Sequence, residues 1–463
     1  MNILLVKLNA EADEIIPPVG LGYLASAVRK SHNVEILDCL KENMNLRDFL
    51  GFLQGKKIDL IGFLFFSMNY EQIKSYSKAI KEKFPGIFIA VGGPHPSALP
   101  RETLEEIQEI DFAFLGEAEL GFAQLADVLA KKKFFPKDLE KVFSLAWRNK
   151  GKIVLNPKKI LENIDDVGLP AWDLLKPEAY PQAPHGSFSK QFPTAPIIIT
   201  RGCPYSCTFC GGSLVSGKRI RYRGLDSVIE EIELLVKKHC IREIHIEDDN
   251  FTMNKDFVEK FCKALIKKNF GITWACPNGV RLDTLDRELL LLMKKSGLYV
   301  ISVGIESGSD RILKSVKKVL TTKQIREKIE LIDSIGFDVI GFVMLGFPTE
   351  TEKEIEKTID FVCSLPLKRI NFSCLQPFPG TEIYANLIEN HEIEKVSWSN
   401  CFLFKANYAP KGLSIEKLRA LRKKGLRKFY LRPKILFSIL IEIKNPKQFY
   451  YAARRGIRWL LLA

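Results

Sequence analysis

Short apolar runs alternate with amphipathic helical patterns over residues 1–135. The helical patterns include Tyr70–Lys83 and Arg101–Ile110, in which apolar residues recur every three or four positions. Unbroken apolar runs between such helices are typical of a parallel sheet covered on both faces. We therefore predict a doubly wound, Rossmann-type α/β domain with five strands, at Ile3–Val6, Val34–Leu37, Leu60–Phe65, Ile87–Val91 and Phe112–Leu115.

A second alternation of strands and helices begins near residue 193. Six apolar runs predict strands, at Ile197–Thr200, Glu243–Glu247, Thr273–Cys276, Tyr299–Val303, Val339–Leu345 and Ile370–Leu375. The patterns between them predict helices, at Ser227–His239, Lys255–Lys268, Glu288–Ser296, Lys323–Ile335 and Glu352–Ser364. Six such units predict a partial (β/α)6 barrel over residues 193–385, with its active site at the carboxyl ends of the strands. Residues 136–192 are predicted to be a linker, and residues 386–463 a basic helical C-terminal region.

Three segments rich in glycine and proline follow strands of the first domain, at 17–23, 92–97 and 116–119. Ligands of doubly wound domains lie beyond the carboxyl ends of the strands, and glycine lets backbone approach a large flat ligand closely. Ordinary turn chemistry is the alternative for any one of these loops. None of the three is a G-x-G-x-x-G dinucleotide fingerprint.

The composition is that of a globular protein: 463 residues, 46% hydrophobic and 27% charged. The net charge is +14, but residues 411–463 alone hold 15 Lys or Arg against Glu416 and Glu442, so the basic character belongs to the C-terminal region. We expect no signal peptide and no apolar run long enough to span a membrane. The expected location is the cytoplasm, where ten cysteines would be reduced thiols.

Three cysteines are clustered as C-x-x-x-C-x-x-C: Cys203, Cys207 and Cys210. Thiolates are the standard ligands of iron–sulfur clusters, and three of them leave one iron of a cubane open for catalysis. A zinc site is the alternative, but it would want a fourth Cys or His, and none lies between Gly211 and Lys238. The other seven cysteines are scattered and are expected to be small buried hydrophobes.

This motif after the first barrel strand resembles that of the radical S-adenosylmethionine (SAM) superfamily. The resemblance implies a four-iron, four-sulfur cluster that cleaves SAM into a 5′-deoxyadenosyl radical. Further matches follow successive predicted strands, from Gly211-Gly212 to Pro377-Phe378-Pro379-Gly380-Thr381. The SAM-binding residues implied in this way are Phe209, Gly211, Gly212, Glu247, Asp249, Arg281, Glu306, Gly346 and Pro348. No single catalytic residue is implied.

The first domain resembles the cobalamin-binding domain that precedes the barrel in one large subfamily. The cobalamin-binding residues implied are Pro18, Gly20, Asp38, Ser67, Gly92, Gly93, His95, Gly116 and Glu117. The D-x-H-x-x-G motif, which supplies a histidine to cobalt, is absent. We therefore expect His95 to line the corrin without ligating cobalt. A degenerate domain that has lost cobalamin is the alternative.

The C-terminal region is basic and contains many aromatic residues, among them Phe429, Phe437 and Trp459. Such a segment can lie on the anionic inner face of a membrane, in which case the substrate would be a lipid. A helical cap over the barrel with a solvated basic face is equally compatible with the pattern. Nucleic-acid binding is disfavoured because no recognised nucleic-acid module accompanies the charge.

The leading functional hypothesis is a cobalamin-dependent radical methyltransferase acting on an unactivated carbon of a small molecule or lipid. Radical cyclisation or rearrangement with the same cofactors, as in anaerobic porphyrin cyclases, is the second. Methylthiolation of transfer RNA is disfavoured because the first domain holds only Cys39 for a second cluster. A non-catalytic corrinoid or iron–sulfur carrier is the remaining class. The implied partner is an electron donor such as flavodoxin or ferredoxin.

Overall fold

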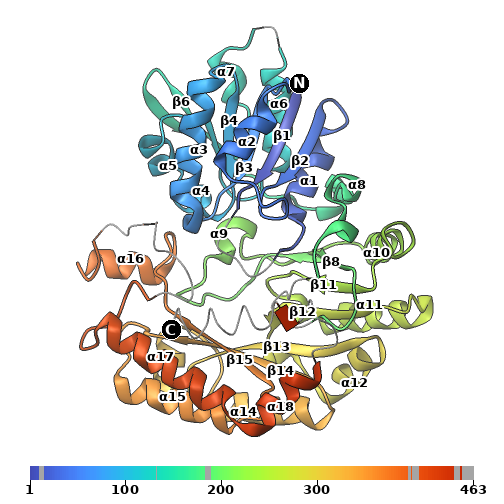
Figure 1. The fold of residues 1–463 in the computed structure, drawn as a ribbon, viewed down its shortest axis with the longest axis vertical. Coiled ribbons are helices and arrows are strands. Elements are labelled where there is room, and N and C mark those ends of the chain that lie inside the picture. Colours follow the sequence, from blue (N-terminus) through green and yellow to red (C-terminus); the bar gives the residue numbers. More distant parts are fainter. Residues whose placement is uncertain are drawn as a thin grey trace.

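The fold was derived from a computed structural model that describes residues 1–9, 15–131, 133–182, 189–394, 398, 406–442 and 449–450. Two α/β units lie one above the other, and the short helix α9 (Gly212–Ser216) lies between them (Figure 1). The predicted fold class is confirmed: a doubly wound sheet, a partial parallel barrel and a helical C-terminal region.

The first unit is a seven-stranded sheet in the order β2-β1-β3-β4-β5-β6-β7. The five predicted strands are present and parallel. The inner residues of β1, β3, β4 and β5 are buried, which is why these strands appear in the sequence as unbroken apolar runs, whereas the edge strand β2 is partly exposed. These strands are β1 (Asn2–Lys7), β2 (Asn33–Asp38), β3 (Leu60–Leu64), β4 (Phe88–Gly92) and β5 (Phe112–Phe114).

Two further strands extend this sheet from the segment that we expected to be a linker. They are β6 (Leu145–Asn149) and β7 (Lys152–Leu155), which pair antiparallel to β5 and to each other. The hairpin turns at Lys150 and Gly151, both with positive φ, which is the geometry of a two-residue hairpin loop. The strands are short and β7 is half-exposed, so their apolar pattern is weak in the sequence.

Helices cover both faces of the first sheet (Figure 1). Helices α1 and α6 pack against each other, and Tyr23 of α1 is buried at the boundary with the second unit. The helices of this unit are α1 (Val19–Val28), α2 (Leu46–Leu53), α3 (Tyr70–Lys83), α4 (Pro94–Ala98), α5 (Pro100–Glu106), α6 (Glu119–Leu129), α7 (Pro136–Leu139) and α8 (Trp172–Leu175).

The second unit is an open, fully parallel six-stranded sheet in the order β15-β14-β13-β12-β11-β8. The predicted partial barrel is therefore confirmed. Its strands are β8 (Thr194–Ile197), β11 (Glu243–Ile246), β12 (Thr273–Val280), β13 (Leu298–Glu306), β14 (Asp338–Leu345) and β15 (Arg369–Cys374). A small ribbon of β9 (Thr200–Arg201) and β10 (Arg221–Tyr222) follows β8.

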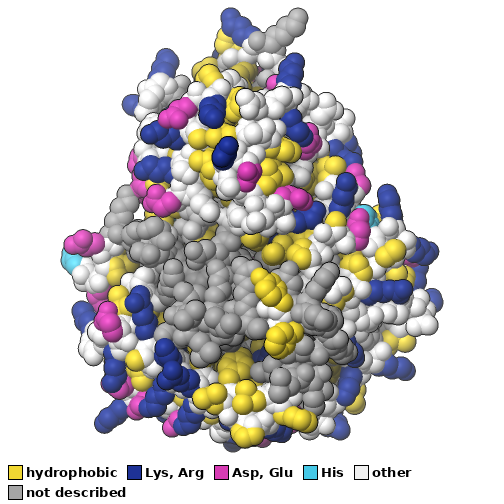
Figure 2. All heavy atoms as spheres, viewed as in Figure 1, with side chains coloured by type: hydrophobic (Ala, Val, Ile, Leu, Met, Phe, Trp, Pro, Cys, Tyr) yellow, Lys and Arg dark blue, Asp and Glu magenta, His cyan; other side chains and the backbone are white. Residues whose placement is uncertain are grey.

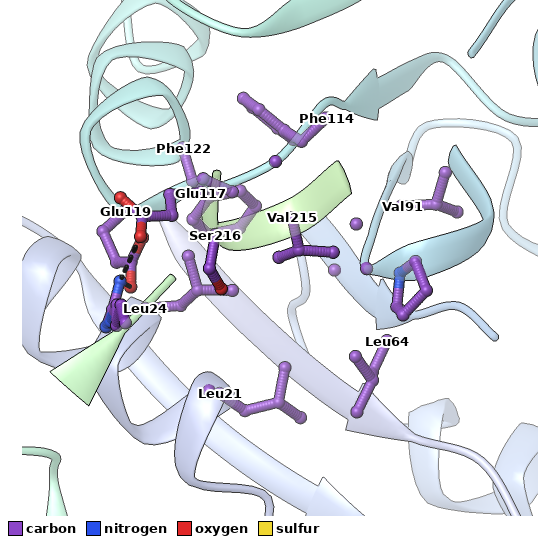
Figure 3. Close-up of a pocket in the computed structure, with 18 of the residues that line it drawn as sticks. Leu21, Leu24, Leu64, Val91, Phe114, Glu117, Glu119, Phe122, Val215 and Ser216 are labelled. Atoms are coloured by element: carbon purple, nitrogen blue, oxygen red, sulfur yellow. Dashed lines mark ion pairs between the residues drawn. The ribbon is translucent and has the colours of Figure 1, made fainter. Parts of the chain in front are cut away.

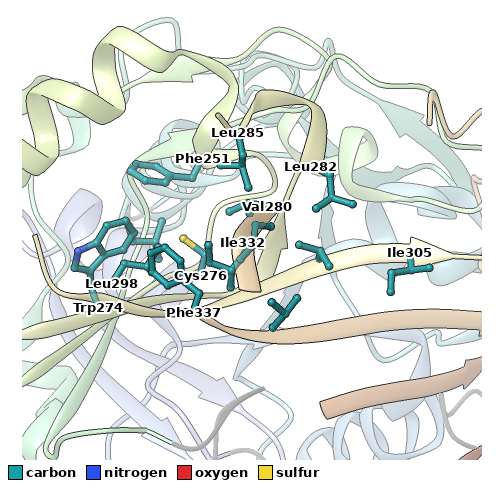
Figure 4. Packing of buried hydrophobic residues seen from close by; sticks show 14 of the residues in the cluster. Phe251, Trp274, Cys276, Val280, Leu282, Leu285, Leu298, Ile305, Ile332 and Phe337 are labelled. Atoms are coloured by element: carbon teal, nitrogen blue, oxygen red, sulfur yellow. The ribbon is translucent and has the colours of Figure 1, made fainter. Parts of the chain in front are cut away.

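Helices pack against the outer face of the barrel through one large apolar core. Within this core the rings of Phe251 and Phe261 stand edge-on to Trp274, with centroids 6.0 and 5.5 Å from that of the indole. Figure 4 shows Phe251 and Trp274 among the neighbouring core residues. These helices are α10 (Leu225–His239), α11 (Lys255–Lys268), α12 (Arg287–Lys295), α13 (Asp310–Ser315), α14 (Thr322–Ser334) and α15 (Glu352–Ser364).

The C-terminal region continues with α16 (Glu382–Glu389), α17 (Ile415–Tyr430) and α18 (Pro433–Glu442). Helix α17 packs on β15, where the buried Arg422 donates from Nε to the carbonyl of Phe372 at 2.8 Å. Its lysines pair with the acids of α15, as Lys417 does with Glu352 at 2.7 Å and Lys428 with Asp360 at 2.6 Å. Basic and acidic side chains accordingly mix over these two helices (Figure 2).

The first part of the basic region is thus a helical cap, which was one of the two alternatives for it. Tyr451, Trp459 and the rest of residues 451–463 lie outside the described residues. No helix in the described part of the chain is long and apolar enough to cross a membrane.

Two helical glycines differ in the space beside them. A Cβ on Gly121 of α6 would lie 2.1 Å from the backbone oxygen of Phe143, whereas nothing lies within 4 Å of a Cβ on Gly51 of α2. We expect Gly121→Ala to lower the free energy of unfolding by about 1–3 kcal/mol through overpacking. Gly51→Ala should raise it by about 0.5–1 kcal/mol through helix propensity. Urea titration of both variants checks the contrast, and equal shifts would contradict it.

Candidate active site

The three clustered cysteines lie on one loop between β9 and α9. Backbone hydrogen bonds shape this loop: the amide of Cys203 donates to Gly217 O at 3.2 Å, and that of Cys210 to Cys207 O at 3.1 Å. Gly202 begins the turn with a φ of +98°, and a Cβ there would lie 2.3 Å from the oxygen of Arg219. Only glycine fits this position, so the loop leaves the strand in one fixed direction.

The thiols of the loop are held in a setting that favours a bound cation. Burial raises the pKa of Cys207 and of Cys210, and the neighbouring thiols of the motif raise it further. The amide of Gly212 donates to Cys210 Sγ at 3.4 Å, which is a contact that stabilises a thiolate or a cluster sulfur. Lys318 and Arg281 act in the opposite sense on the pKa of Cys207. Three soft sulfur donors on one loop fit an iron–sulfur cluster.

A single-ion site would need side chains that converge on one point. Among the residues that the structure describes, no three His, Cys, Asp or Glu side chains are arranged to hold one metal ion. In a cubane each thiolate ligates its own iron, so the three sulfurs need not converge.

Glu247 and Asp249 follow β11, and Asp249 faces the cysteine loop. Glu247 accepts from the amide of Asn278 at both its backbone oxygen (3.0 Å) and its carboxylate (3.1 Å). A Cβ on Gly212 would lie 3.4 Å from the carboxylate of Asp249, and burial raises the pKa of Asp249. The neighbouring Asp248 accepts from the amides of Ile199 and Thr200, both at 2.8 Å, and so ties the end of β11 to the strand before the motif.

Arg281 and Glu306 approach the loop from β12 and β13. The Arg281 guanidinium is paired with Asp283 through two bonds of 2.9 Å and stacks on the ring of Tyr205 at 3.6 Å. Because Tyr205 belongs to the cysteine motif, Arg281 holds the loop from the barrel side. Glu306 has a φ of +63° and pairs with Lys318 at 2.9 Å. A left-handed conformation in a residue other than glycine costs energy and is concentrated at functional sites.

Gly346 and Pro348 lie in the turn after β14. The buried carboxylate of Glu350 accepts from the amides of Gly346 (2.7 Å) and Phe347 (3.1 Å), and burial raises the pKa of Glu350 to about 7. Phe347 in turn packs on Phe209 of the cysteine motif, with ring centroids 5.6 Å apart. Glu350, which was not among the predicted site residues, therefore sets the turn that carries two of them, Gly346 and Pro348.

A cavity of about 290 Å³ lies where the first unit meets the barrel (Figure 3). Its wall includes Gly20, Gly92, Gly93, Gly116 and Glu117, which are five of the nine predicted cobalamin residues. Glu247 and Asp249 line it from the barrel side. Most of the remaining wall is apolar, with Leu21, Leu24, Leu64, Val91, Phe114, Phe122 and Val215.

Small residues create the room in this cavity. Nothing lies within 4 Å of a Cβ on Gly20, and the nearest atom to one on Gly92 is 3.8 Å away, so both positions border open space. A cavity with an apolar wall, a glycine rim and a few charged groups at one end fits a large organic cofactor such as cobalamin.

The structure places the other four predicted cobalamin residues outside this cavity. Pro18 is buried at the start of α1. The carboxylate of Asp38 accepts from Lys7 at 3.1 Å and from Tyr180 at 3.0 Å. Ser67 is bonded to His95 at 2.9 Å, so both residues turn away from the cavity lining.

His95 was expected to line the corrin, but it is 1% exposed within an aromatic cluster. Its ring stacks on Phe65 with centroids 4.4 Å apart and meets Tyr70 and Trp398 edge-on. Burial lowers the pKa of His95 to about 4, so the ring is neutral at pH 7. The reason for the difference is local: His95 lies in the short helix α4, which turns this side chain into the core and leaves Gly93 and Pro94 at the rim.

A buried ion-pair cluster, which the sequence analysis missed, joins the two units at the cavity wall. Glu117 accepts from Arg221 through bonds of 2.6 and 2.8 Å, and Glu119 pairs with Arg201 at 2.7 Å. The Arg201 guanidinium also stacks on the ring of Tyr23 at 4.9 Å. Arg201 lies two residues before Cys203, so the first unit fixes the start of the cluster loop. The only sign of these ion pairs in the sequence was the presence of two arginines flanking the motif and two acids in Gly116-Glu117-Ala118-Glu119.

Comparisons with known protein families agree with this geometry. Residues 197–362 match the radical SAM superfamily, and residues 5–126 match the B12 binding domain. An uncharacterized methyltransferase of Pyrococcus horikoshii is 30% identical over 96% of this chain and 93% of its own length. The chain belongs to the cobalamin-dependent radical SAM enzymes. The predicted cofactor set of a four-iron cluster, SAM and cobalamin is confirmed at the level of the family.

Two curated relatives and one solved structure illustrate which enzymes this chain is similar to. Cytidylyl-2-hydroxyethylphosphonate methyltransferase of Streptomyces wedmorensis is 27% identical over 80% of this chain and 78% of the relative. An anaerobic magnesium-protoporphyrin IX monomethyl ester cyclase of Rubrivivax gelatinosus is 26% identical over 81% and 67%. The methyltransferase TsrM of Kitasatospora setae, solved with cobalamin and a [4Fe-4S] cluster, shares the fold with a TM-score of 0.67 at 18% identity, over 84% of this chain and 78% of that one.

Replacing the three motif cysteines tests their role as cluster ligands. We expect the variant Cys203→Ala/Cys207→Ala/Cys210→Ala, reconstituted anaerobically, to lose its iron and all formation of 5′-deoxyadenosine, because no other described residue group replaces three thiolates. Cys240→Ala, an exposed cysteine outside the motif, is the matched control and should keep both. Iron content and product chromatography are the measurements. Iron retained by the triple variant would contradict the assignment.

Removal of one partner from the ion-pair cluster should be strongly destabilising, because it leaves a buried charge unpaired. Arg201→Met leaves Glu119 without its cation and should lower the free energy of unfolding by about 3–5 kcal/mol. Adding Glu119→Leu should recover part of that loss. Arg219→Met is the control, since Arg219 and its partner Glu162 are both 78% exposed and such pairs contribute little. Urea titration of the intact chain checks this, and a single-variant effect no larger than the control would contradict it.

Proposed function

We propose that this chain methylates an unactivated carbon of an organic small molecule or a lipid. The observation that carries the proposal is a wall shared by the two proposed cofactor sites: Asp249 faces the cysteine loop and, together with Glu247, lines the cavity bordered by Gly20 and Gly92. Methyl transfer by radical chemistry needs both cofactors next to one substrate position. When bound, the cluster with SAM supplies a hydrogen-abstracting radical, and cobalamin supplies the methyl group.

The chain's own residues bind, orient and exclude water. Cys203, Cys207 and Cys210 are the proposed ligands of three irons, while Gly211 and Gly212 leave backbone room beside the fourth. Arg281 orients the loop by stacking on Tyr205. The apolar cavity wall keeps water from the reacting groups, which protects a radical from side reactions.

We infer that an external flavodoxin or ferredoxin delivers the electron to the cluster. The support is an open groove beside the cysteine loop that includes Pro204, Lys218, Arg219, Met253 and Lys255. Met253 is 42% exposed there, and three cations face one lining acid, Asp256. A basic rim with an apolar contact suits an acidic carrier protein, and Pro204 is adjacent to a proposed cluster ligand.

We propose that the last described segments of the chain contact an anionic membrane. Arg432 and Lys434 lie near several exposed large side chains in the last described segments. These side chains are Leu431, Leu436, Phe437, Phe449 and Tyr450. Aromatic and basic residues together suit an anionic interface, which would give the enzyme access to a lipid substrate.

Radical cyclisation is the second candidate, because a cyclase from Rubrivivax gelatinosus matches 81% of this chain. The two reactions differ in mass balance: methylation adds one carbon per turnover, whereas cyclisation adds none. This difference makes them separable even before the substrate is identified.

A cavity-filling variant tests the methyltransferase proposal. Gly20→Phe should occupy the cavity without a clash at its Cβ, because nothing lies within 4 Å of that position. We expect it to keep its iron and SAM cleavage but to lose bound hydroxocobalamin and transfer of a labelled methyl group from methyl-deuterated SAM. Gly20→Ala is the control and should keep all four properties.

The measurements are the visible spectrum after anaerobic reconstitution and mass spectrometry of small-molecule and lipid fractions incubated with the enzyme. A product that gains the deuterated methyl group supports methylation. A product of altered structure without the label would overturn methylation in favour of cyclisation, and corrinoid retained by Gly20→Phe would overturn the cavity assignment.

A further inference from the structure

A second cavity lies at the opposite end of the barrel from the cofactor sites. Its volume is about 450 Å³, and its lining includes Thr273, Leu298, Asp338 and Arg369, which begin strands β12, β13, β14 and β15. The predicted SAM residues lie at the other ends of the barrel strands. Strand β14 alone has eight residues, which separates its two ends by about 23 Å. The cavity is therefore distinct from the active site.

The lining of this cavity has an excess of positive charge. Lys190, Lys294, Lys368 and Arg369 face one acid, Asp338, among the described lining residues. Lys368 pairs with Asp338 at 2.6 Å, and Lys294 donates to the carbonyls of Ile335 (2.5 Å) and Gly336 (3.3 Å). Four cations against one carboxylate leave a surplus of three charges around the cavity.

Glu243 is the other acid close to this wall, and its carboxylate is turned into the protein. It is fully buried and accepts from the hydroxyls of Thr273 (2.6 Å) and Tyr299 (2.8 Å) and from the amide of Lys190 (2.9 Å). His245 is bonded to it at 2.9 Å. Glu243 thus orders the cavity wall and is fully hydrogen-bonded. When its carboxylate is counted with Asp338, the four cations still exceed the acids around the cavity by two charges.

Two further features indicate what this cavity accepts. Ser189 is 5% exposed, lines the cavity, and its hydroxyl has no hydrogen-bond partner among the described residues. A buried hydroxyl without a partner is costly, so a polar ligand that bonds to it gains free energy. Leu298, Val300 and Ile340 form an apolar part of the lining. The site therefore combines cationic donors, a hydroxyl and an apolar surface.

We propose that this cavity binds an organic phosphate, with the phosphoryl group among Lys190, Lys368 and Arg369 and the apolar body against Val300 and Ile340. Lysine and arginine are the usual ligands of phosphoryl oxygens, and arginine binds them in a bidentate manner. A carboxylate would use fewer of these donors. The proposal concerns a second small-molecule site and does not depend on methyl transfer.

Isothermal titration of the full-length holoenzyme with phenyl phosphate tests the proposal. We expect one site per chain, weaker binding of inorganic phosphate, no binding of phenol, and affinity that falls as sodium chloride is raised, because the contacts are ionic. Gly20→Phe should bind phenyl phosphate like the wild type, which separates this cavity from the cofactor cavity. Absence of binding at millimolar phenyl phosphate would overturn the proposal.

Three substitutions locate the site. Lys190→Gln is exposed and should fold normally, and it should weaken binding about tenfold through loss of a charge-assisted bond. Asp338→Asn removes the lining acid and should tighten binding. Lys267→Gln, an exposed lysine on α11, is the control and should leave the dissociation constant unchanged. Equal affinity in Lys190→Gln and the control, or weaker binding in Asp338→Asn, would overturn the assignment.

Discussion

The buried ion pairs between Glu117, Glu119, Arg201 and Arg221 are the constraint on which the rest of the active site depends. Two carboxylates from the first unit and two guanidinium groups from the start of the barrel balance each other in a place that excludes water. Buried charges of this kind are tolerable only when each one is paired. The pairing fixes the two units in one orientation, and the cavity exists because of that orientation.

The same cluster connects the cavity to the cysteine loop over a very short path. Arg201 is separated from Cys203 by Gly202 alone, and Gly202 has no freedom because the backbone of Arg219 fills the space beside it. Arg281 then holds the loop from the opposite side by stacking on Tyr205. The loop is therefore held from both units, and the position of the proposed iron ligands follows from the docking of the domains.

Much of this arrangement could be predicted because its signals are local. The cysteine spacing and the alternation of apolar runs with helices each occupy a short stretch of sequence, and the parallel strands and fold class of both units were predicted from them. The ion pairs could not be predicted, since Glu117 and Arg221 are 104 residues apart and only the fold brings them together. His95 was misplaced because its neighbours Gly93 and Pro94 do line the cavity, while a single helical turn points its ring elsewhere. Strands β6 and β7 were missed because they are short and half-covered.

The ion-pair cluster also limits how this architecture can diversify. A substitution that removes one of its four charges leaves an opposite charge unpaired where water is excluded. Substitutions at these four positions are therefore tolerated mainly in compensating pairs. Recombination that joins the first unit of one relative to the barrel of another would mismatch both halves of the cluster unless the partners had been inherited together. The two halves of this enzyme are thus separate in sequence, but they have to be exchanged together if the buried charges are to stay paired.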